Sequence, residues 1–335
     1  MKVAVFGATG YTGRLITAEL HRRHVDTLLL GRDEKALAAI EGARAVKAVS
    51  LDDPSSLVDA LRGCDVVISC VAPFTRLGAP VVEAAIAAGC HYVDTTGEQR
   101  WVRRVYDEFG PRAAAAGVTL VPAATDDGVP GDLIAGLVAR RLAKVETLRV
   151  HHGVFDASLS RGTMVSFGHI AASPPLAWQD GEWRETDAGA REPADFPRDG
   201  EQPSWALPGP ELIAIQRHVS ARTLDATMNM DVVTNVSYLT DEVIAAAPSG
   251  PTEEERRASR FTIMAEAHGP DGTRARGHVS GDDTYGSTAL IAVEVAVRLG
   301  ARGAPVGAVP PSLAFDPAQF LDALKPFGIT WQVEG

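Results

Sequence analysis

The stretch that decides the fold is Met1–Gly13, which reads MKVAVFGATGYTG. Val3–Phe6 is a continuous apolar run, as expected for a strand buried on both faces of a parallel sheet. The GxxGxxG turn of Gly7–Gly13 follows at once, and a helical pattern begins after it. Glycine permits a tight turn and close approach to a pyrophosphate, and a helix N-terminus offers N–H groups and a positive dipole end. A strand, this turn and a helix in that order predict a dinucleotide-binding site, with an ordinary glycine-rich turn as the alternative.

Composition narrows the class of protein. The chain has 335 residues, of which 45% are hydrophobic and 22% charged, so we expect a globular protein of one large or two modest domains. No apolar run approaches the ~20 residues of a membrane span, and a strand that begins at residue 3 leaves no room for a signal peptide. Cys64, Cys70 and Cys90 lack metal-ligand spacing, which predicts a reduced cytoplasmic protein without a metal site. The net charge of -11 argues against nucleic acid and anionic membrane as partners.

Strands and helices alternate up to about residue 123. This order predicts an α/β fold in which residues 1–124 form a doubly wound parallel Rossmann sheet that binds NADP. The expected strands after the first are Thr27–Leu30, Ala45–Val49, Asp65–Cys70, Cys90–Glu98 with its polar tail, and Val118–Pro122.

The residue that distinguishes NAD from NADP in such a domain lies about twenty residues beyond the glycine loop. Arg32 stands there and offers a guanidinium to a 2′-phosphate. Asp33 is a rival that could bind the ribose of NAD, but it is better placed to cap the helix Glu34–Ile40. The sequence therefore favours NADPH, with a solvated surface arginine as the alternative. Asp52 follows the third strand, where an adenine edge would rest, although helix capping explains it equally well.

The pattern changes after residue 124. Residues 125–284 predict an α+β substrate or dimerisation domain on a mixed or antiparallel sheet, with a polar loop feeding a helix at Leu133–Leu142. A long loop at residues 173–209 suggests a lid, a binding loop or an oligomer arm, so a homodimer is plausible. Residues 285–335 predict a helix and a tail that returns to the Rossmann domain. The expected strands are Glu146–His152, Ala226–Tyr238, Phe261–His268 and Ala275–Val279, the last two joined by a hairpin turn at residues 269–272.

Several motifs together resemble the saccharopine dehydrogenase-like family of reductases, which includes saccharopine reductases and trans-acting enoyl reductases. The resemblance covers most of the chain, but TDDGVPGDL stands where the family has a phrase nearer GFDSVPSDL. It implies that Val71, Ala72 and Pro73 line the nicotinamide ribose and that Thr96 and Gly97 close the nicotinamide side. It also implies that the pyrophosphate and 2′-phosphate are held by Gly7, Thr9, Gly10, Tyr11, Thr12, Gly13 and Arg32. The motifs are GATGYTG, GR, VAPF, AGCHYVDTTGE, DDGVPGDL, RGTMVS, RHV and GDDTYGSTALIAVEVAV.

Reduction of an imine or a conjugated double bond also needs a proton donor beside the nicotinamide. His151 and His152 are adjacent on one expected strand and must point to opposite faces, so one of them at most faces the cleft. Each candidate could instead have a purely structural role. The histidines could be ordinary sheet residues, the aspartates could cap a helix or form a hinge, and the tyrosine could be a packing residue. The candidates are Asp126, Asp127, His152, Tyr285 and, more weakly, His218.

The sequence thus favours an NADPH-dependent oxidoreductase that reduces a C=C (enoyl) or C=N (imine) bond of a small molecule. One alternative is a saccharopine-type dehydrogenase that acts on a secondary amine of an amino acid. Arg161 and Arg217 would have to grip the carboxylates of such a substrate, whereas an aromatic long loop suggests a more apolar one. The other alternative is an NADPH-binding sensor without catalysis.

Overall fold

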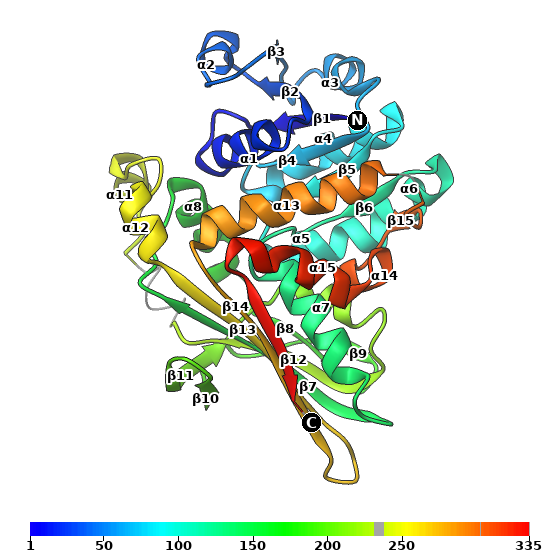
Figure 1. Ribbon diagram of the computed structural model, residues 1–335, viewed down its shortest axis with the longest axis vertical. Coiled ribbons are helices and arrows are strands. Elements are labelled where there is room, and N and C mark those ends of the chain that lie inside the picture. The colour runs from blue at the N-terminus through cyan, green and yellow to red at the C-terminus, as the bar shows by residue number, and fades with distance from the viewer. Residues whose placement is uncertain (231–237, 302, 335) are drawn as a thin grey trace. The chain divides into compact units, whose positions relative to one another are not determined.

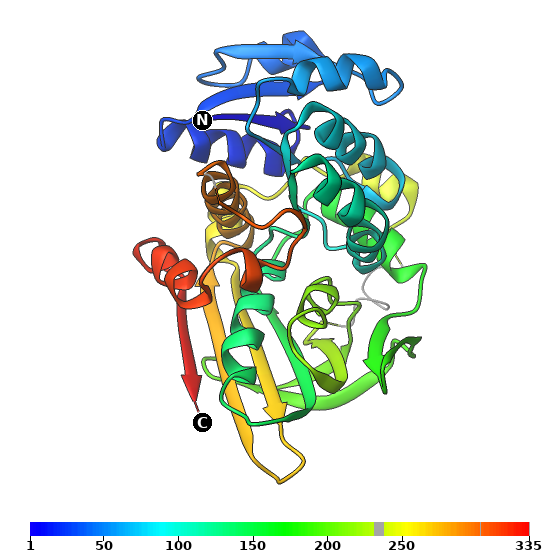
Figure 2. The same cartoon turned by 90° about the vertical axis from the view of Figure 1, so that its right-hand side faces the viewer.

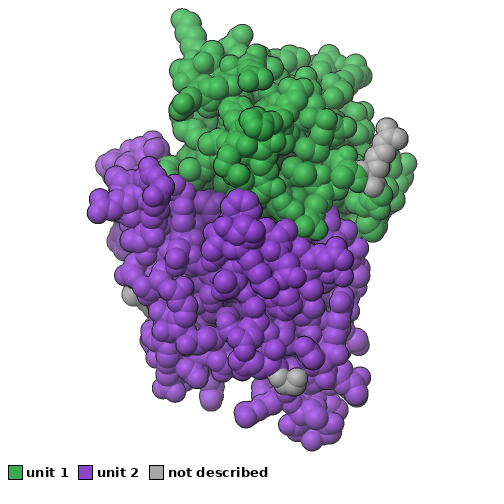
Figure 3. All heavy atoms as spheres, viewed as in Figure 1, with its two compact units in different colours: residues 1–96, 100–125, 288–309 green, residues 97–99, 126–287, 310–335 purple. Residues whose placement is uncertain are grey.

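The computed structural model describes residues 1–230, 238–301 and 303–334. Two compact units make up the chain, coloured green and purple in Figure 3. Their bounds are Met1–Thr96, Arg100–Thr125 and Thr288–Val309 for unit 1, and Gly97–Gln99, Asp126–Ser287 and Pro310–Gly335 for unit 2.

Unit 1 is built on a parallel sheet. Its described strands stand in the order β15-β6-β5-β4-β1-β2-β3, and every neighbouring pair is parallel (Figure 1). The strand order reverses between β1 and β4, so their carboxyl ends border the switch point at which such sheets bind ligands. The strands are β1 (Lys2–Phe6), β2 (Asp26–Gly31), β3 (Ala45–Ala48), β4 (Val66–Ser69), β5 (His91–Asp94), β6 (Thr119–Val121) and β15 (Gly307–Ala308).

The helices of unit 1 bury the sheet. β4 is buried along its whole length, as the apolar runs of the sequence predict for strands covered on both faces. One core cluster joins Phe6 and Val67 of the sheet to Leu57, Val81 and Ala113 on the covering helices. The helices are α1 (Tyr11–Arg22), α2 (Glu34–Ala38), α3 (Pro54–Leu61), α4 (Phe74–Ala88), α5 (Gln99–Arg104), a π-helical turn (Val105–Phe109), α6 (Gly110–Ala116) and the greater part of α13 (Thr284–Gly300).

Unit 2 is built on a mixed sheet. The described strands follow the path β10-β11-β12-β7-β13-β14-β16, and off this path β8 pairs with β12 and β9 pairs with β8. β12 pairs with β7 in parallel, and the other pairs are antiparallel. The two sheets confirm the predicted fold class. The strands are β7 (Val145–Phe155), β8 (Leu176–Gln179), β9 (Glu182–Glu185), β10 (Ala190–Phe196), β11 (Gly200–Ala206), β12 (Ala221–Met228), β13 (Arg260–His268), β14 (Arg274–Asp282) and β16 (Thr330–Glu334).

The central helix of unit 2 is α7 (Gly128–Ala139), which packs against β13, β14, α9 and α15 (Figure 2). Almost all of its residues are buried, as is typical of a helix that is apolar nearly all round, and the one charged residue in it is the buried Asp132. The helix begins five residues before the predicted Leu133, because Asp127 caps it at Gly128. The other helices of unit 2 are α8 (Arg161–Ala171), α9 (Glu211–Ile215), α11 (Asp241–Ala246), α12 (Glu253–Ala258), α14 (Pro311–Ala314), α15 (Pro317–Leu324) and a 3-10 turn (Lys325–Phe327).

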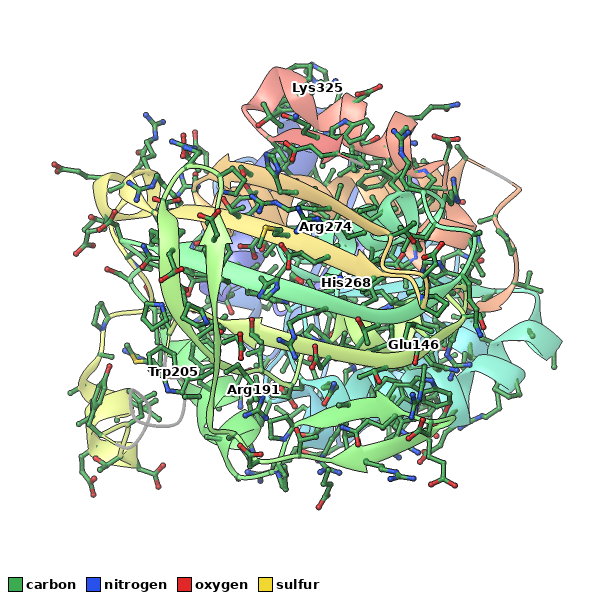
Figure 4. The ribbon with its side chains drawn as sticks, turned by 90° about the horizontal axis from the view of Figure 1, so that it is seen from below. Glu146, Arg191, Trp205, His268, Arg274 and Lys325 are labelled. Carbon is green, nitrogen blue, oxygen red and sulfur yellow. The ribbon has the colours of Figure 1, made fainter. Side chains whose placement is uncertain are left out.

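Two predictions about the second half of the chain need correction. The long loop expected at residues 173–209 is instead two antiparallel strand pairs, β8–β9 and β10–β11. Figure 4 shows Arg191 and Trp205 on the second of these pairs. The tail after Val309 does not return to unit 1: β16 pairs with β14 and α15 packs on α7, both within unit 2.

The other expected strands agree with the structure to different extents. The hairpin β13–β14 is confirmed, with His268 and Arg274 flanking its turn (Figure 4). The strand expected at Ala226–Tyr238 is observed as β12, which begins at Ala221 and ends at Met228, and residues 231–237 lie outside the described part. No helix in the described residues is both long and apolar enough to cross a membrane.

Candidate functional site: a glycine loop and a buried histidine–glutamate pair

The turn after β1 depends on glycine at its first position. Gly7 has φ +86, and its N–H donates to the carbonyl oxygen of Leu30 at 3.0 Å, which ties the loop to β2. A Cβ at Gly7 would come within 2.7 Å of Cγ2 of Val71, the second residue after β4. The carboxyl ends of β1 and β4 therefore meet in direct contact, with no room for a larger residue.

The last glycine of the loop sets the start of α1. A Cβ at Gly13 would collide with the carbonyl oxygen of Gly7 and come within 2.9 Å of Cα of Ala8. Gly10 is the N-cap and has no side chain with which to cap the first-turn amides of α1. A helix that starts this close to the loop and without a side-chain cap directs N–H groups and a positive dipole end at any anion bound there. The loop therefore fits the pyrophosphate of a dinucleotide.

Of the aspartates beyond β2 and β3, Asp33 and Asp53 are helix caps, and Asp52 accepts from the hydroxyl of Ser50 at 3.4 Å. Asp33 accepts from the backbone N–H groups of residues 35 and 36 at 3.0 and 3.1 Å, so it caps α2 as predicted. Arg32 is exposed at the carboxyl end of β2, and the described residues show no hydrogen bond or ion pair of its side chain. The capping alternative for Asp52 is wrong, because Asp53 caps α3 through the N–H of Ser56 at 3.1 Å. The cofactor roles of Arg32 and Asp52 stay predictions.

A buried carboxylate organises the ends of β5 and β6. Asp94 is fully buried and accepts four hydrogen bonds: from the hydroxyl of Tyr92 and the indole of Trp101, both at 2.8 Å, and from the N–H groups of Ala123 and Thr96 at 2.9 and 3.1 Å. Burial raises the pKa of Asp94, against the lowering effect of these donors. The sequence pattern missed this role, although it is Asp94 that fixes the predicted cofactor residue Thr96.

The remaining cofactor candidates are placed as follows. Val71, Ala72 and Pro73 connect β4 to α4, at the switch point of the sheet. Gly97 belongs to unit 2, where Cδ1 of Ile170 on α8 lies 4.0 Å from the position of a Cβ on Gly97.

In unit 2 the two adjacent histidines of β7 point to opposite faces, as predicted. His151 lies on one face, with Nδ1 2.8 Å from Oγ1 of Thr227 and Nε2 3.6 Å from Oε2 of Glu266. On the other face, Nε2 of His152 lies 2.9 Å from Oε1 of Glu211. Both side chains of the His152–Glu211 pair are fully buried.

The pair has unsatisfied polar atoms. Among the described residues, Nδ1 of His152 and Oε2 of Glu211 are buried without a hydrogen-bond partner. Asp127 directs Oδ2 toward this nitrogen at 3.9 Å, while its Oδ1 accepts from the N–H of Gly128 at 2.7 Å. Burial lowers the pKa of His152, but the charge and hydrogen bond of Glu211 and the charges of Asp127 and Asp126 outweigh it and raise the pKa above its ordinary value. The imidazole therefore tends to hold a second proton.

Tyr285 has a different setting from the histidine pair. Its hydroxyl accepts from the N–H of Ser160 at 2.7 Å and lies 2.8 Å from Oγ1 of Thr163, at the start of α8. His218 is held by the buried Asp132, whose Oδ1 lies 2.6 Å from Nε2 of the histidine. The capping bond of Asp127 and these two contacts give structural roles to three candidates, and their catalytic roles stay predictions.

Glu211 is the residue that sequence reasoning missed. It lies 59 residues beyond His152, at the start of a helix of 5 residues. A Pro-Glu pair is typical of an exposed helix start, so nothing local marks Glu211 as buried.

Comparison with known proteins shows which proteins this chain resembles in sequence. Residues 3–121 match the family model of the saccharopine dehydrogenase NADP binding domain. A trans-acting enoyl reductase of Mycobacterium leprae is 32% identical over 155 residues, which cover 43% of this chain and 37% of that protein. The human saccharopine dehydrogenase-like oxidoreductase is 28% identical over 192 residues, which cover 49% of this chain and 44% of that protein. The matched stretch thus spans less than half the length of either relative.

A solved structure extends the similarity to the whole fold. Saccharopine dehydrogenase (L-Glu forming) from Saccharomyces cerevisiae aligns over 100% of both chains, with a TM-score of 0.65 and 14% identity. At that identity the match shows a shared fold.

Proposed function

We propose that the protein is an NADPH-dependent reductase of the saccharopine dehydrogenase-like type, because residues 3–121 match the family model of the saccharopine dehydrogenase NADP binding domain. Its reaction adds a hydride and a proton across the C=C bond of an enoyl compound or the C=N bond of an imine. The observation that carries the proposal is the glycine loop, whose tight backbone path any Cβ at Gly7 or Gly13 would block by collision. When bound, NADPH supplies the hydride.

The residues of unit 1 have binding roles in this proposal. The loop backbone and the start of α1 hold the pyrophosphate, and Arg32 grips the 2′-phosphate that distinguishes NADPH from NADH. Asp94 keeps the backbone of Thr96 in place through its hydrogen bond at 3.1 Å.

His152 provides the proton. A general acid must hold a proton at the working pH, and the surrounding carboxylates raise the pKa of His152. The burial of His152 in unit 2 strengthens its charge interactions with these carboxylates.

Helix α8 favours an apolar enoyl substrate over a diacid. Met164, Phe167 and Ile170 lie on α8, and none of its side chains is fully buried although the helix is rich in apolar residues. The helix contacts the segment that follows β5, because Oγ of Ser166 donates to Oε1 of Glu98 at 3.3 Å. In contrast, the guanidinium of Arg161 is engaged by the carbonyl oxygen of Ala247, with Nε at 3.1 Å.

The first experiment is a fluorescence titration of the protein with NADPH and NADH side by side, followed by NADPH oxidation assays. We expect selective NADPH binding, and oxidation with 2-enoyl thioesters that increases with acyl chain length. Faster turnover of imines formed from amino acids would favour the secondary-amine dehydrogenase instead. NADPH binding without turnover of either class would favour the sensor, and no nucleotide binding would refute the proposal. The same sample, sized by light scattering, tests the proposed homodimer.

A further inference from the structure

Arg14 is a basic side chain beside the glycine loop that the sequence motif leaves without a role. It follows Gly13 near the start of α1 and is exposed to solvent. Its Nε donates to the carbonyl oxygen of Thr9 at 3.1 Å, so the side chain folds back over the loop. The guanidinium of Arg14 is therefore held at the glycine loop, within unit 1.

The bond to Thr9 also fixes the backbone of the loop. The peptide between Thr9 and Gly10 is held at both ends, because its carbonyl oxygen accepts from Arg14 and its N–H donates to the carbonyl oxygen of Gly7 at 3.0 Å. A peptide held in this way does not have to be ordered when a nucleotide binds, which favours binding.

The loop is tied to β2. The N–H groups of Gly7 and Ala8 both donate to the carbonyl oxygen of Leu30, at 3.0 and 3.4 Å, and Thr9 is the next residue. Helix α1 also packs on β2. Arg32 lies two residues beyond Leu30, directly after the end of that strand. The guanidinium bonded to Thr9 and the guanidinium of Arg32 are thus both anchored on the β2 side of the loop.

The strand order assigns this side to the adenosine half of a dinucleotide. In the sheet of unit 1, β1 lies between β4 and β2, and the strand order reverses between β1 and β4. A dinucleotide lies across the carboxyl edge of such a sheet, with its pyrophosphate at the start of the first helix and its adenosine ribose at the end of the second strand. The 2′-phosphate of NADPH is carried by that ribose, so it lies on the side where both arginines are anchored.

Both guanidinium groups have unused donors. Nε is the only nitrogen of Arg14 with a partner among the described residues, and that partner is a neutral carbonyl oxygen. Arg32 is exposed, and no carboxylate of the described chain pairs with it. The adjacent Asp33 is engaged as the cap of α2. A phosphate can accept charge-assisted hydrogen bonds from more than one guanidinium, each of which binds its oxygens in pairs.

We propose that Arg14 is a second arginine of the 2′-phosphate site, which binds this phosphate together with Arg32 and so contributes to a preference for NADPH over NADH. The inference rests on the proposed function, because it takes NADPH as the cofactor. Nε of Arg14 stays on the carbonyl oxygen of Thr9, and the terminal nitrogens donate to the phosphate. NADH has no 2′-phosphate and gains only from the ordered loop.

The test variant is Arg14→Gln. The side-chain nitrogen of glutamine is bonded to Cδ, as Nε is in arginine, so it keeps the bond to Thr9 while the charge and the terminal nitrogens are lost. The matched control is Arg62→Gln, which removes the same charge from an exposed arginine of unit 1 that pairs with Asp59 at 2.8 Å. Dissociation constants are measured by fluorescence titration for NADPH and NADH, and by calorimetry for adenosine 2′,5′-bisphosphate, which carries the 2′-phosphate without a nicotinamide.

We expect Arg14→Gln to weaken the binding of NADPH and of the bisphosphate about tenfold and that of NADH less than about twofold. Arg62→Gln should change none of the three, and Arg14→Lys, which restores the charge without the planar fork, should recover part of the loss. Equal losses for NADPH and NADH would overturn the inference, since Arg14 would then only order the loop or contact the pyrophosphate. Unchanged NADPH binding in Arg14→Gln would overturn it as well.

The same titrations separate this inference from the proposed function. A wild-type protein that binds no nucleotide would overturn both. Selective loss of NADPH binding in Arg14→Gln, without turnover of any enoyl or imine compound by the wild type, would overturn the reductase and support the role of Arg14.

Discussion

Replacement of Asp94 by asparagine tests how strongly one buried carboxylate holds unit 1 together. An asparagine keeps one acceptor oxygen, which would face the N–H groups of Thr96 and Ala123, and turns its NH2 group toward Tyr92 and Trp101. The tyrosine hydroxyl can rotate to accept, but the indole N–H only donates, so it is left buried without an acceptor. A hydrogen bond to a charged group contributes about 1.5–3 kcal/mol, and a stranded buried donor costs a similar amount. Because burial raises the pKa of Asp94, loss of the charge offsets part of this cost. We expect Asp94→Asn to lower the free energy of unfolding by about 2–3 kcal/mol.

Urea unfolding followed by tryptophan fluorescence measures the change, because Trp101 lies in the affected cluster. The control is Asp59→Asn, since Asp59 pairs with Arg62 at 2.8 Å on the surface and should change stability by about 0.5 kcal/mol or less. NADPH affinity should also fall in Asp94→Asn, because the backbone of Thr96 loses the negative charge that holds it. An Asp94→Asn protein as stable as the control would refute the reasoning, since it would mean that Asp94 is not a charged acceptor in the folded protein.

Three further predictions concern the cofactor loop and the histidine. Gly13→Ala should weaken NADPH binding about tenfold or more, because its Cβ collides with the carbonyl oxygen of Gly7, whereas Gly168→Ala in the open space on α8 should bind normally in the same fluorescence titration. Arg32→Ala should weaken NADPH binding about tenfold and leave NADH binding unchanged, and equal losses would contradict the 2′-phosphate role. The folded-state pKa of His152 is raised, so its stabilising charge is fully present below the ordinary histidine pKa and is lost as pH rises through the raised value. Urea unfolding of wild type and His152→Gln should therefore differ most at about pH 6 and less as pH rises, and a gap that widens with pH would contradict the assignment.

The Rossmann unit could be predicted from the sequence because its strands are buried on both faces. A run such as Val3–Phe6 can be recognised as such a strand without knowledge of its partners. The collisions that require glycine at position 13 also lie within the loop itself. The strands at residues 173–209 escaped prediction for the opposite reason. β10 reads AREPADF, with mostly exposed residues and a proline, so no apolar alternation marks it.

The sequence predicts individual residues of the site but not the partners that they contact. The alternation of His151 and His152 follows from strand geometry alone. The partner of His152 does not, because Glu211 becomes buried only when α9 packs on α7 between two glycines. The sequence shows Asp94 as part of a polar strand end, but its four donors come from β5, the loop after β5, α5 and the segment after β6. Such convergence depends on the tertiary fold.

The division of the chain into units has a consequence for engineering. The segment Gly97–Gln99 belongs to unit 2, although the residues on both sides of it belong to unit 1, and the polypeptide changes unit again after Thr125, Ser287 and Val309. A single cut therefore separates neither unit as an intact module. A chimera meant to exchange substrate preference with a relative would have to transplant residues 97–99, 126–287 and 310–335 together. Grafts that leave out the three-residue piece would lose Gln99, and with it the bonds that hold Gly209 and Leu176.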